Sequence, residues 1–382
     1  MTKSLLLTVT FACVLLMIGC HGAATITGGR ILFDLGYGKS DSSLDVSTST
    51  RNDISVTMNK GILHVLSRKE GKIIRLSSYG QTLAMWYDPQ KGSAPLVLKS
   101  VKMDDLSLTK ELGRFAIQVP FTDPALLAVD SRQMLYVEDA GTIRRFDSSD
   151  TELQPLGKEG LGSAPFSGVI AITVLENDDL SVFSMSESGL EVYFFDRAGS
   201  FLNKLALQDQ SLPTPAPLAQ KYPSTPGSRI IVSMESAYPS LLAGTRSLFL
   251  KMNYYFEKSD PQSGVALTID PIGSWIIAID AGNGEIVDSF ALQSALSDSG
   301  IDQQLIAAKS YVVVCVKWAT DGLGGEMYCY SPKGKMIGKR SFLAPDKSAE
   351  LVAYTVGDDR QFYILSQLPS TLRMYSWALP LR

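Results

Sequence analysis

Histidine is nearly absent from this sequence: the 382 residues contain only His21 and His64. Metal chemistry that needs several histidine ligands is therefore excluded by number, and HExxH, GxSxG, Walker and CxxC motifs do not occur. Lys and Arg total 35 against 39 Asp and Glu, a formal net charge of −4 without a basic stripe. We therefore expect no nucleic-acid partner, no metal and no cofactor.

Long apolar runs are also missing, except at the N-terminus. After Lys3, residues 5–18 are apolar apart from Thr8 and Thr10. This run is too short to cross about 30 Å of hydrocarbon comfortably, but it fits the apolar part of a secretory signal peptide. We therefore predict that residues 1–19 are removed on export.

The signal segment ends in Met17-Ile18-Gly19-Cys20. This stretch resembles a bacterial lipobox, which implies cleavage between Gly19 and Cys20 and acylation of the Cys20 thiol. The resemblance predicts a lipoprotein of the bacterial cell envelope, held in the inner or outer membrane and facing the periplasm or the surface. Several acyl chains would hold it far more firmly than one. An ordinary signal peptide with a chance cysteine is the alternative.

The rest of the chain has the composition of one folded domain. Hydrophobic residues make up 45% and charged residues 19%, which suits a packed core. We expect residues 20–29 to be a flexible leash and residues 30–382 a single domain. Short β-branched and aromatic runs separated by Gly, Asp, Asn and Ser predict an all-β fold, and helical periodicity is confined to the neighbourhood of residues 298–309.

Five hairpins share one plan: an apolar strand, a polar residue, a tight turn and a second strand. The polar side chain can accept turn N–H groups, and glycine permits the positive φ of a chain reversal. Each copy is preceded by one or two further strand candidates, which favours four-stranded blades and hence a β-propeller. The paired polar and turn residues are Ser77 and Gly80, Asp147 and Asp150, Asp196 and Gly199, Asp280 and Gly284, and Ser331 and Gly334.

These hairpins resemble the outer strands of known propeller repeats. VYFFDRAGSFL is similar to NHL repeats, and IIAIDAGNGEI resembles the quinoprotein pattern A-x-D-x-x-T-G through Ala278, Asp280 and Gly284. It departs from that pattern at Asn283 and at Asp288, where the quinoprotein repeat has its docking tryptophan. A lipobox followed by an irregular propeller of this length resembles uncharacterised spirochaete lipoproteins.

The strand candidates group into about six blades of four strands, with room for a seventh around residues 95–121. The last group has three strands, and the isolated strand at residues 30–35 would complete it and close the ring. A β-sandwich pair or an irregular β-solenoid is the alternative architecture. The predicted blades span residues 54–87, 125–157, 168–207, 229–292, 305–343 and 351–378.

Two loops and two cysteines complete the candidates. Residues 208–228 contain five prolines and are either a partner-docking loop or a plain surface connection. Residues 319–326 form a glycine-rich turn whose acids lack the spacing of a known calcium loop. Cys315 and Cys329 lie on neighbouring predicted strands, where a disulfide and two buried thiols are equal expectations.

No set of catalytic residues emerges from the sequence. His64 reads as a strand residue, and the acid pairs Asp104-Asp105, Asp178-Asp179 and Asp358-Asp359 read as solvated turns. We therefore expect a non-catalytic lipoprotein that binds an unidentified protein partner through a propeller face. The alternatives are a subunit of the outer-membrane assembly machinery and a propeller enzyme, either a hydrolase or a quinone-dependent dehydrogenase.

Overall fold

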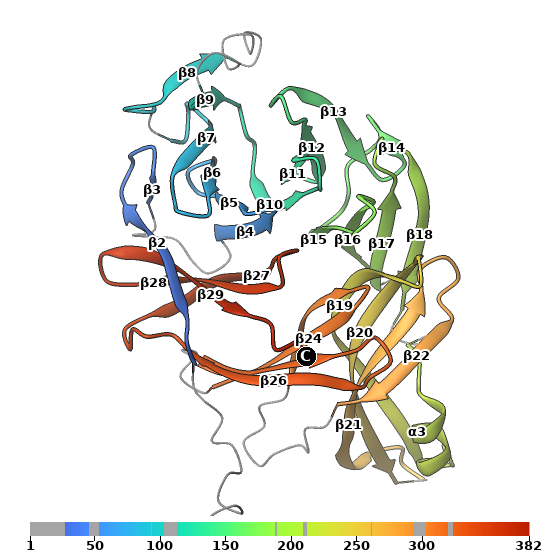
Figure 1. Ribbon diagram of the computed structural model, residues 1–382. Helices are drawn as coiled ribbons and strands as arrows, with labels where there is room; N and C mark the ends of the chain where they lie inside the picture. The colour runs from blue at the N-terminus through green and yellow to red at the C-terminus, as the bar shows by residue number, and fades with distance from the viewer. Residues whose placement is uncertain are drawn as a thin grey trace, which may run out of the picture.

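The computed structural model describes residues 27–45, 53–92, 94–102, 113–187, 189–208, 212–260, 262–292, 303–319 and 324–381. They form six β-sheets arranged as the blades of a propeller (Figure 1). The predicted all-β propeller is confirmed. The signal segment with Gly19 and Cys20 lies outside the described residues. No described helix is long and apolar enough to cross a membrane.

The first three blades follow one another along the chain. Blade 1 contains β4 (Ile54–Asn59), β5 (Ile62–Ser67), β6 (Lys72–Ser77), β7 (Thr82–Tyr87), β8 (Lys99–Lys102) and β9 (Phe115–Gln118). Blade 2 contains β10 (Pro124–Val129), β11 (Leu135–Asp139), β12 (Thr142–Phe146), β13 (Glu152–Gly157) and β14 (Gly160–Leu161). Blade 3 contains β15 (Val169–Val174), β16 (Leu180–Ser186), β17 (Gly189–Phe195) and β18 (Phe201–Leu207).

The other three blades complete the ring. Blade 4 contains β19 (Ser228–Leu242), β20 (Thr245–Ser259), β21 (Ala266–Asp280) and β22 (Ile286–Ala291). Blade 5 contains β23 (Gln304–Lys309), β24 (Val312–Trp318), β25 (Gly324–Tyr330), β26 (Met336–Leu343) and the short β1 (Thr27–Gly28). Blade 6 contains β27 (Glu350–Val356), β28 (Gln361–Gln367), β29 (Thr371–Ala378), β2 (Arg30–Tyr37) and β3 (Ser43–Leu44).

The N-terminal strand closes the ring, as predicted. β2 pairs antiparallel with β29 from Arg30 opposite Ser376 to Gly36 opposite Thr371. Leu35 is 1% exposed, and the Arg373 guanidinium holds the Asp34 carboxylate at 2.6 Å. Blade 6 is therefore built from both ends of the chain, so it cannot be completed without residues 30–37.

Three details differ from the sequence prediction. The prediction of a seventh blade around residues 95–121 is wrong. β9 pairs in parallel with β7, and β8 pairs in parallel with β9, so both strands extend blade 1. Helical periodicity around residues 298–309 is also misleading, because residues 304–309 form β23, where pairing with β24 and burial override local propensity. Residues 265–275, VALTIDPIGSW, also fit the hairpin plan in sequence, but residues 266–280 form the single long strand β21.

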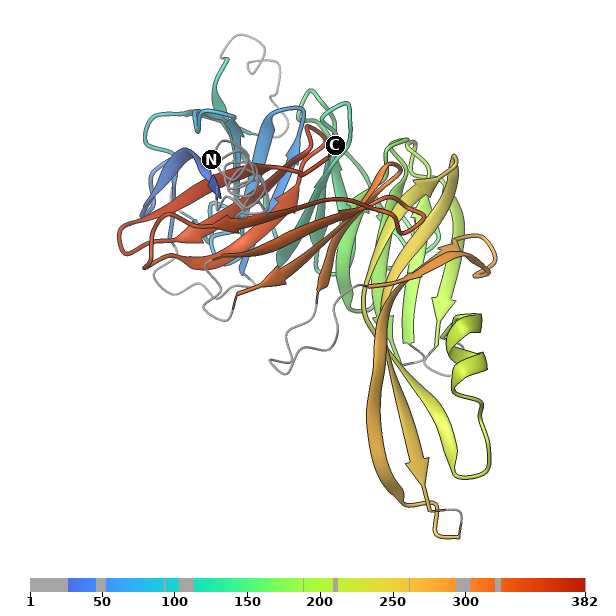
Figure 2. The ribbon, with the colours of Figure 1, turned by 60° about the horizontal axis from the view of Figure 1, so that its bottom comes forward.

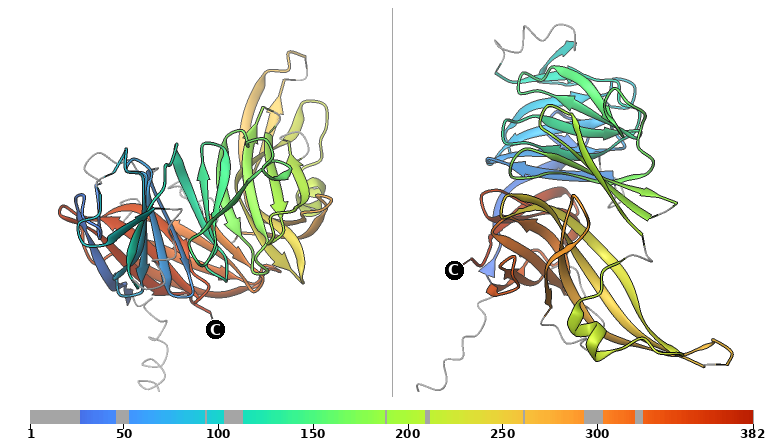
Figure 3. Two further views of the ribbon diagram at one scale, coloured as in Figure 1. Left: turned by 90° about the horizontal axis from the view of Figure 1, so that it is seen from above. Right: turned by 90° about the vertical axis from the view of Figure 1, so that its right-hand side faces the viewer.

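Strands β19, β20 and β21 are 15 residues each, and their far ends project as a ribbon beyond the other blades (Figures 2 and 3). The proline-rich segment, including helix α3 (Ala216–Lys221), covers one face of this ribbon. Tyr254 donates its hydroxyl to the Pro213 carbonyl at 2.6 Å, and the rings of Tyr222 and Phe256 lie 5.2 Å apart. The described part of this segment is therefore packed against its own chain.

The five predicted hairpin turns have the expected backbone. Each turn residue has a positive φ: Gly80, Asp150, Gly199, Gly284 and Gly334. The polar residue of each hairpin accepts N–H groups of its own turn. Examples are Asp147 Oδ1, which accepts from Ser149 and Thr151, and Ser331 Oγ, which accepts from Lys335.

These turns also join the blades, because each one contacts the preceding blade. A Cβ added to Gly80 would lie 2.5 Å from Phe33. One added to Gly199 would lie 2.6 Å from Arg145, and one added to Gly334 would lie 2.4 Å from Phe290. Asp150 instead forms an ion pair with Arg75 of blade 1 at 2.8 Å, and the Arg75 guanidinium lies over the Trp86 ring. The turn is thus both a chain reversal and the contact between neighbouring blades.

Candidate functional site

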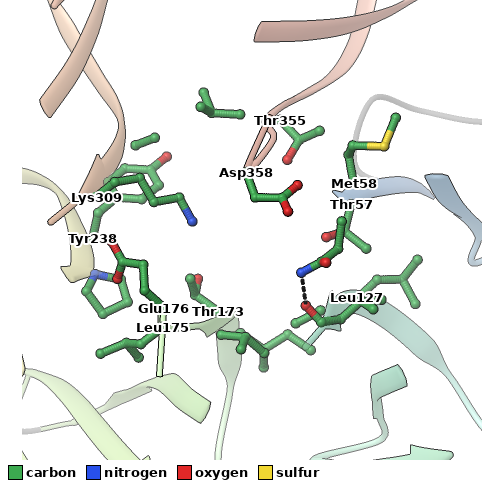
Figure 4. Close-up of a pocket in the computed structure, with 18 of the residues that line it drawn as sticks. Thr57, Met58, Leu127, Thr173, Leu175, Glu176, Tyr238, Lys309, Thr355 and Asp358 are labelled. Atoms are coloured by element: carbon green, nitrogen blue, oxygen red, sulfur yellow. Dashed lines mark hydrogen bonds between the residues drawn. The ribbon is translucent and has the colours of Figure 1, made fainter. Parts of the chain in front are cut away.

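A cavity of about 370 Å³ lies where the innermost strands of the six blades meet. Every blade contributes to its wall through β4, β10, β15, β19, β23 or β27. Thr57, Thr173 and Thr355 are placed around it by three different blades, among apolar side chains such as Leu127 (Figure 4). A wall of this kind combines apolar contact with a few oriented polar groups, as small-molecule sites do.

The turns at one end of the cavity are linked to one another, and we call this set of turns the collar. Lys60 donates its backbone N–H to Asp358 at 3.0 Å and its ammonium to the Ser131 carbonyl at 2.7 Å. Ser131 donates its N–H and its hydroxyl to the two oxygens of Asp178, at 2.9 and 2.8 Å. The turns of blades 6, 1, 2 and 3 are therefore fixed relative to one another.

The remaining blades join the same collar. Ser310 of blade 5 donates its N–H to Glu176 of blade 3 at 2.5 Å. Arg360 of blade 6 lies 5.2 Å from the centre of the Tyr311 ring of blade 5. Arg246, just after the β19–β20 turn, binds Asp179 of blade 3 at 3.2 Å. All six blades thus contribute to the collar.

Three ionisable side chains from three blades point into the cavity at this end: Glu176, Lys309 and Asp358 (Figure 4). Each carboxylate accepts a backbone N–H with one oxygen, which restricts its orientation at the cavity wall. Lys309 ends strand β23 and is half-buried. A carboxylate and an ammonium held in one cavity can move a proton and stabilise a developing negative charge.

Tyr238 lies on the wall contributed by β19. Burial, and a hydrogen bond with Tyr354 of blade 6, raise the pKa of Tyr238 far above its ordinary value. Its hydroxyl therefore stays protonated throughout the physiological range and is able to donate a hydrogen bond.

The sequence had pointed to part of the collar without assigning it a role. Of the noted acid pairs, Asp178-Asp179 and Asp358-Asp359 belong to collar turns, whereas Asp104-Asp105 lies outside the described residues. Asp358 faces the cavity, whereas Asp359 is bonded to Gln361 and Tyr363. Sequence reasoning missed Glu176 and Lys309. The feature that could have identified them is their place in the repeat, because each stands at or just beyond the end of an innermost strand.

His64 is a buried strand residue, as expected. It is fully buried, and its Nε2 accepts a hydrogen bond from Arg75 Nε at 3.1 Å. Burial, and then the Arg75 charge, hold the pKa of His64 well below its ordinary value, so the imidazole is neutral. It belongs to the contact between blades 1 and 2 and lies apart from the cavity lining.

Cys315 and Cys329 are not joined by a disulfide. Cys315 stands opposite Tyr328, and Cys329 opposite Val314, so the two thiols project from opposite faces of the sheet. Both are buried, each in a different hydrophobic cluster, and burial raises the pKa of Cys329 to about 12. The structure therefore agrees with the expectation of two buried thiols and not with the expectation of a disulfide.

The described residues contain no group of three or more His, Cys, Asp and Glu that could hold a metal ion. In the glycine-rich turn, Asp321 lies outside the described residues. Glu326 is engaged by the Tyr328 hydroxyl at 2.6 Å and by the Lys339 ammonium at 2.7 Å.

No protein-family model matches the chain, and no curated protein matches it. Among solved structures it is similar to virginiamycin B lyase from Staphylococcus aureus, with 12% identity, a TM-score of 0.44, and 91% of this chain and 99% of that one covered. It is also similar to a gluconolactonase from Xanthomonas campestris, with 12% identity, a TM-score of 0.42, and 87% and 89% covered. A third is regucalcin, a calcium-binding protein from Agrobacterium tumefaciens, with 11% identity, a TM-score of 0.39, and 94% and 96% covered.

At these identities the likeness concerns the fold alone. The expectation that this is not an enzyme is corrected, because it rested only on missing local motifs, and proteins of the same fold include a lyase and a gluconolactonase. The likeness itself assigns no activity to this chain. The physical reason for the error is that a motif search finds catalytic groups that are close in sequence. In a propeller the groups of one cavity come from separate blades, so the lack of a local motif does not count against catalysis.

Proposed function

We propose that the protein is a propeller hydrolase that cleaves a small carboxylic ester, open or cyclic, in the central cavity. The observation that carries this proposal is the convergence of Glu176, Lys309 and Asp358, from three blades, in a cavity of about 370 Å³. A cavity of this size suits a small substrate. The collar supports the proposal because it fixes the carboxylates of Glu176 and Asp358 before a substrate arrives.

The reaction needs a base, a nucleophilic water and a group that stabilises the oxyanion. One of the two carboxylates removes a proton from water, and the resulting hydroxide adds to the ester carbonyl carbon. The Lys309 ammonium stabilises the negative oxygen, and the carbon–oxygen bond to the leaving group then breaks. The proton taken by the carboxylate passes to the leaving oxygen, which restores the site. An open ester then releases an acid and an alcohol, and a cyclic ester releases one hydroxy acid.

Turnover of short-chain p-nitrophenyl esters and small lactones by the purified full chain tests this proposal. Glu176→Gln or Asp358→Asn should lower kcat by about 10²–10⁴-fold, depending on which carboxylate is the base. Lys309→Met should lower it by about 10²–10³-fold. The matched controls Glu159→Gln and Lys335→Met remove exposed charges far from the cavity lining and should leave kcat unchanged. Full activity in all three cavity variants would refute the proposal.

We also propose that Cys20 carries the lipid that holds the protein at the cell envelope. Support comes from the apolar run of residues 5–18 followed by Gly19-Cys20. Cys20→Ala should abolish incorporation of labelled fatty acid, with palmitate as the probe. Continued partitioning of the processed Cys20→Ala protein into detergent would refute anchorage at this residue.

A further inference from the structure

A second cavity, of about 440 Å³, lies at blade 6 and is separate from the central one. Its lining comes from β2, from the turn after β6, from β26 and from the β28–β29 pair. Tyr363 and Trp377 are buried within it, and Tyr79 at its side is 81% exposed. The β27–β28 turn stands between the two cavities, with Asp358 lining the central one and Asp359 this one.

Two guanidinium groups line this second cavity. Arg30 begins strand β2, is exposed, and acts electrostatically on the Tyr363 hydroxyl. Arg340 reaches across from blade 5 and donates Nη1 to the Ala378 carbonyl at 3.0 Å. That bond fixes the Arg340 side chain and leaves its other donors for a ligand.

Neither guanidinium has a carboxylate partner within the described residues, which sets the pair apart from many arginines of this protein. Seven others form ion pairs there: Arg68, Arg75, Arg144, Arg197, Arg229, Arg246 and Arg373. Asp359, the acid of the cavity, is already engaged by the Tyr363 hydroxyl and the Gln361 N–H. The cavity therefore presents two guanidinium groups without a carboxylate partner in the described residues, and one carboxylate that is already hydrogen-bonded to its neighbours.

We propose that this cavity binds a phosphate ester, with the phosphate between Arg30 and Arg340 and the organic part against the exposed Tyr79 ring. Guanidinium groups match phosphate oxygens with paired, charge-assisted hydrogen bonds. A volume of about 440 Å³ has room for a phosphorylated monosaccharide or for the headgroup of an anionic phospholipid. Both sources share the same recognition chemistry. The proposal does not depend on catalysis in the central cavity.

Calorimetric titration of the full chain in detergent with glucose 6-phosphate, and with glucose as its uncharged match, tests a soluble source. Flotation of the chain without its lipid anchor (residues 21–382), with phosphatidylglycerol vesicles against phosphatidylcholine vesicles, tests a lipid source. Arg30→Gln and Arg340→Gln should each weaken binding about tenfold or more in the arm that shows it. Arg132→Gln removes an exposed arginine outside the cavity lining and should leave binding unchanged.

Arg340→Lys keeps the charge but loses the planar fork, so it should keep the fold and still weaken binding. This variant separates ligand binding from any folding defect of Arg340→Gln. Binding of glucose 6-phosphate supports a soluble ligand, and binding of the anionic vesicles alone supports a lipid headgroup. Equal binding by wild type and both Gln variants, or binding in neither arm, overturns the proposal. Glu176→Gln should leave this binding intact, so failure here is distinguishable from failure of the hydrolase proposal.

Discussion

The contact between Gly80 and Phe33 gives the most direct test of how the blades are held together. Gly80 has a φ of +77°, and a Cβ at this position would lie 2.5 Å from the Phe33 ring. Gly80→Ala should therefore cost about 1 kcal/mol for the left-handed backbone and a further 1–3 kcal/mol, roughly, for overpacking. Gly61 of the same blade is the matched control, because its φ is +75° and its Cβ position is open. Gly61→Ala should cost only the backbone share.

Urea unfolding, followed by tyrosine and tryptophan fluorescence, measures both variants. We expect Gly80→Ala to lose about 1–3 kcal/mol more than Gly61→Ala. Phe33→Gly removes both the ring and the Cβ of residue 33, which would lie 2.6 Å from the new Cβ, so Phe33→Gly and Gly80→Ala together should cost less than the sum of the two single changes. Equal losses in the two glycine variants, or full additivity in the double variant, would show that the turn does not dock against the preceding blade.

Three further predictions follow from the same packing. Leu35→Ala should lower the free energy of unfolding, measured by urea titration, by about 2–4 kcal/mol, because Leu35 is buried in the ring-closing strand. Ile31→Ala in the same strand should lower it by less than about 1 kcal/mol, because Ile31 is 47% exposed. Replacing residues 213–222 by a short Gly-Ser linker should lower the melting temperature and increase binding of a hydrophobic dye, because it uncovers the ribbon face; an unchanged melt would contradict this. Because the pKa of His64 is lowered by folding, the unfolded chain binds more protons below about pH 6.5, so stability falls as the pH falls. Between pH 7.5 and 5.5 wild type should lose about 1.4 kcal/mol more than His64→Gln in urea titrations, and equal losses would refute the assignment.

The blade pattern could be predicted because its signals are local. Strand alternation, the polar residue and the positive-φ turn all lie within about a dozen residues, so the first blade was placed at 54–87 and β4–β7 span the same residues. Ring closure by residues 30–35 was also predictable, since an incomplete last blade needs a fourth strand. Local signals failed at β21, where one strand continues through Pro271 and Gly273, because pairing with β20 holds it across two bulges.

The candidate site could not be predicted in the same way. Glu176 and Lys309 are 133 residues apart, Lys309 and Asp358 are 49 residues apart, and no spacing rule connects them. Their common feature is a place in the repeat, at or just beyond the end of the innermost strand of a blade. Recognising that place requires the blade boundaries first and then the knowledge that all innermost strands face one axis. The scan of acid pairs therefore found Asp358 but assigned it to solvent.

The docking turns also explain why the repeat is so irregular in sequence. Where the quinoprotein pattern has a tryptophan, this chain has Asp288, and the contact between blades is made by the turn itself. The turn residue is restricted, because it must adopt a positive φ and approach its neighbour closely. Its partner is not restricted in the same way: Phe33, Arg75, Arg145, Leu205 and Phe290 fill the same role in successive blades. A repeat held together in this manner keeps its turn and lets its partner vary, so its turns are the part that the sequence reveals.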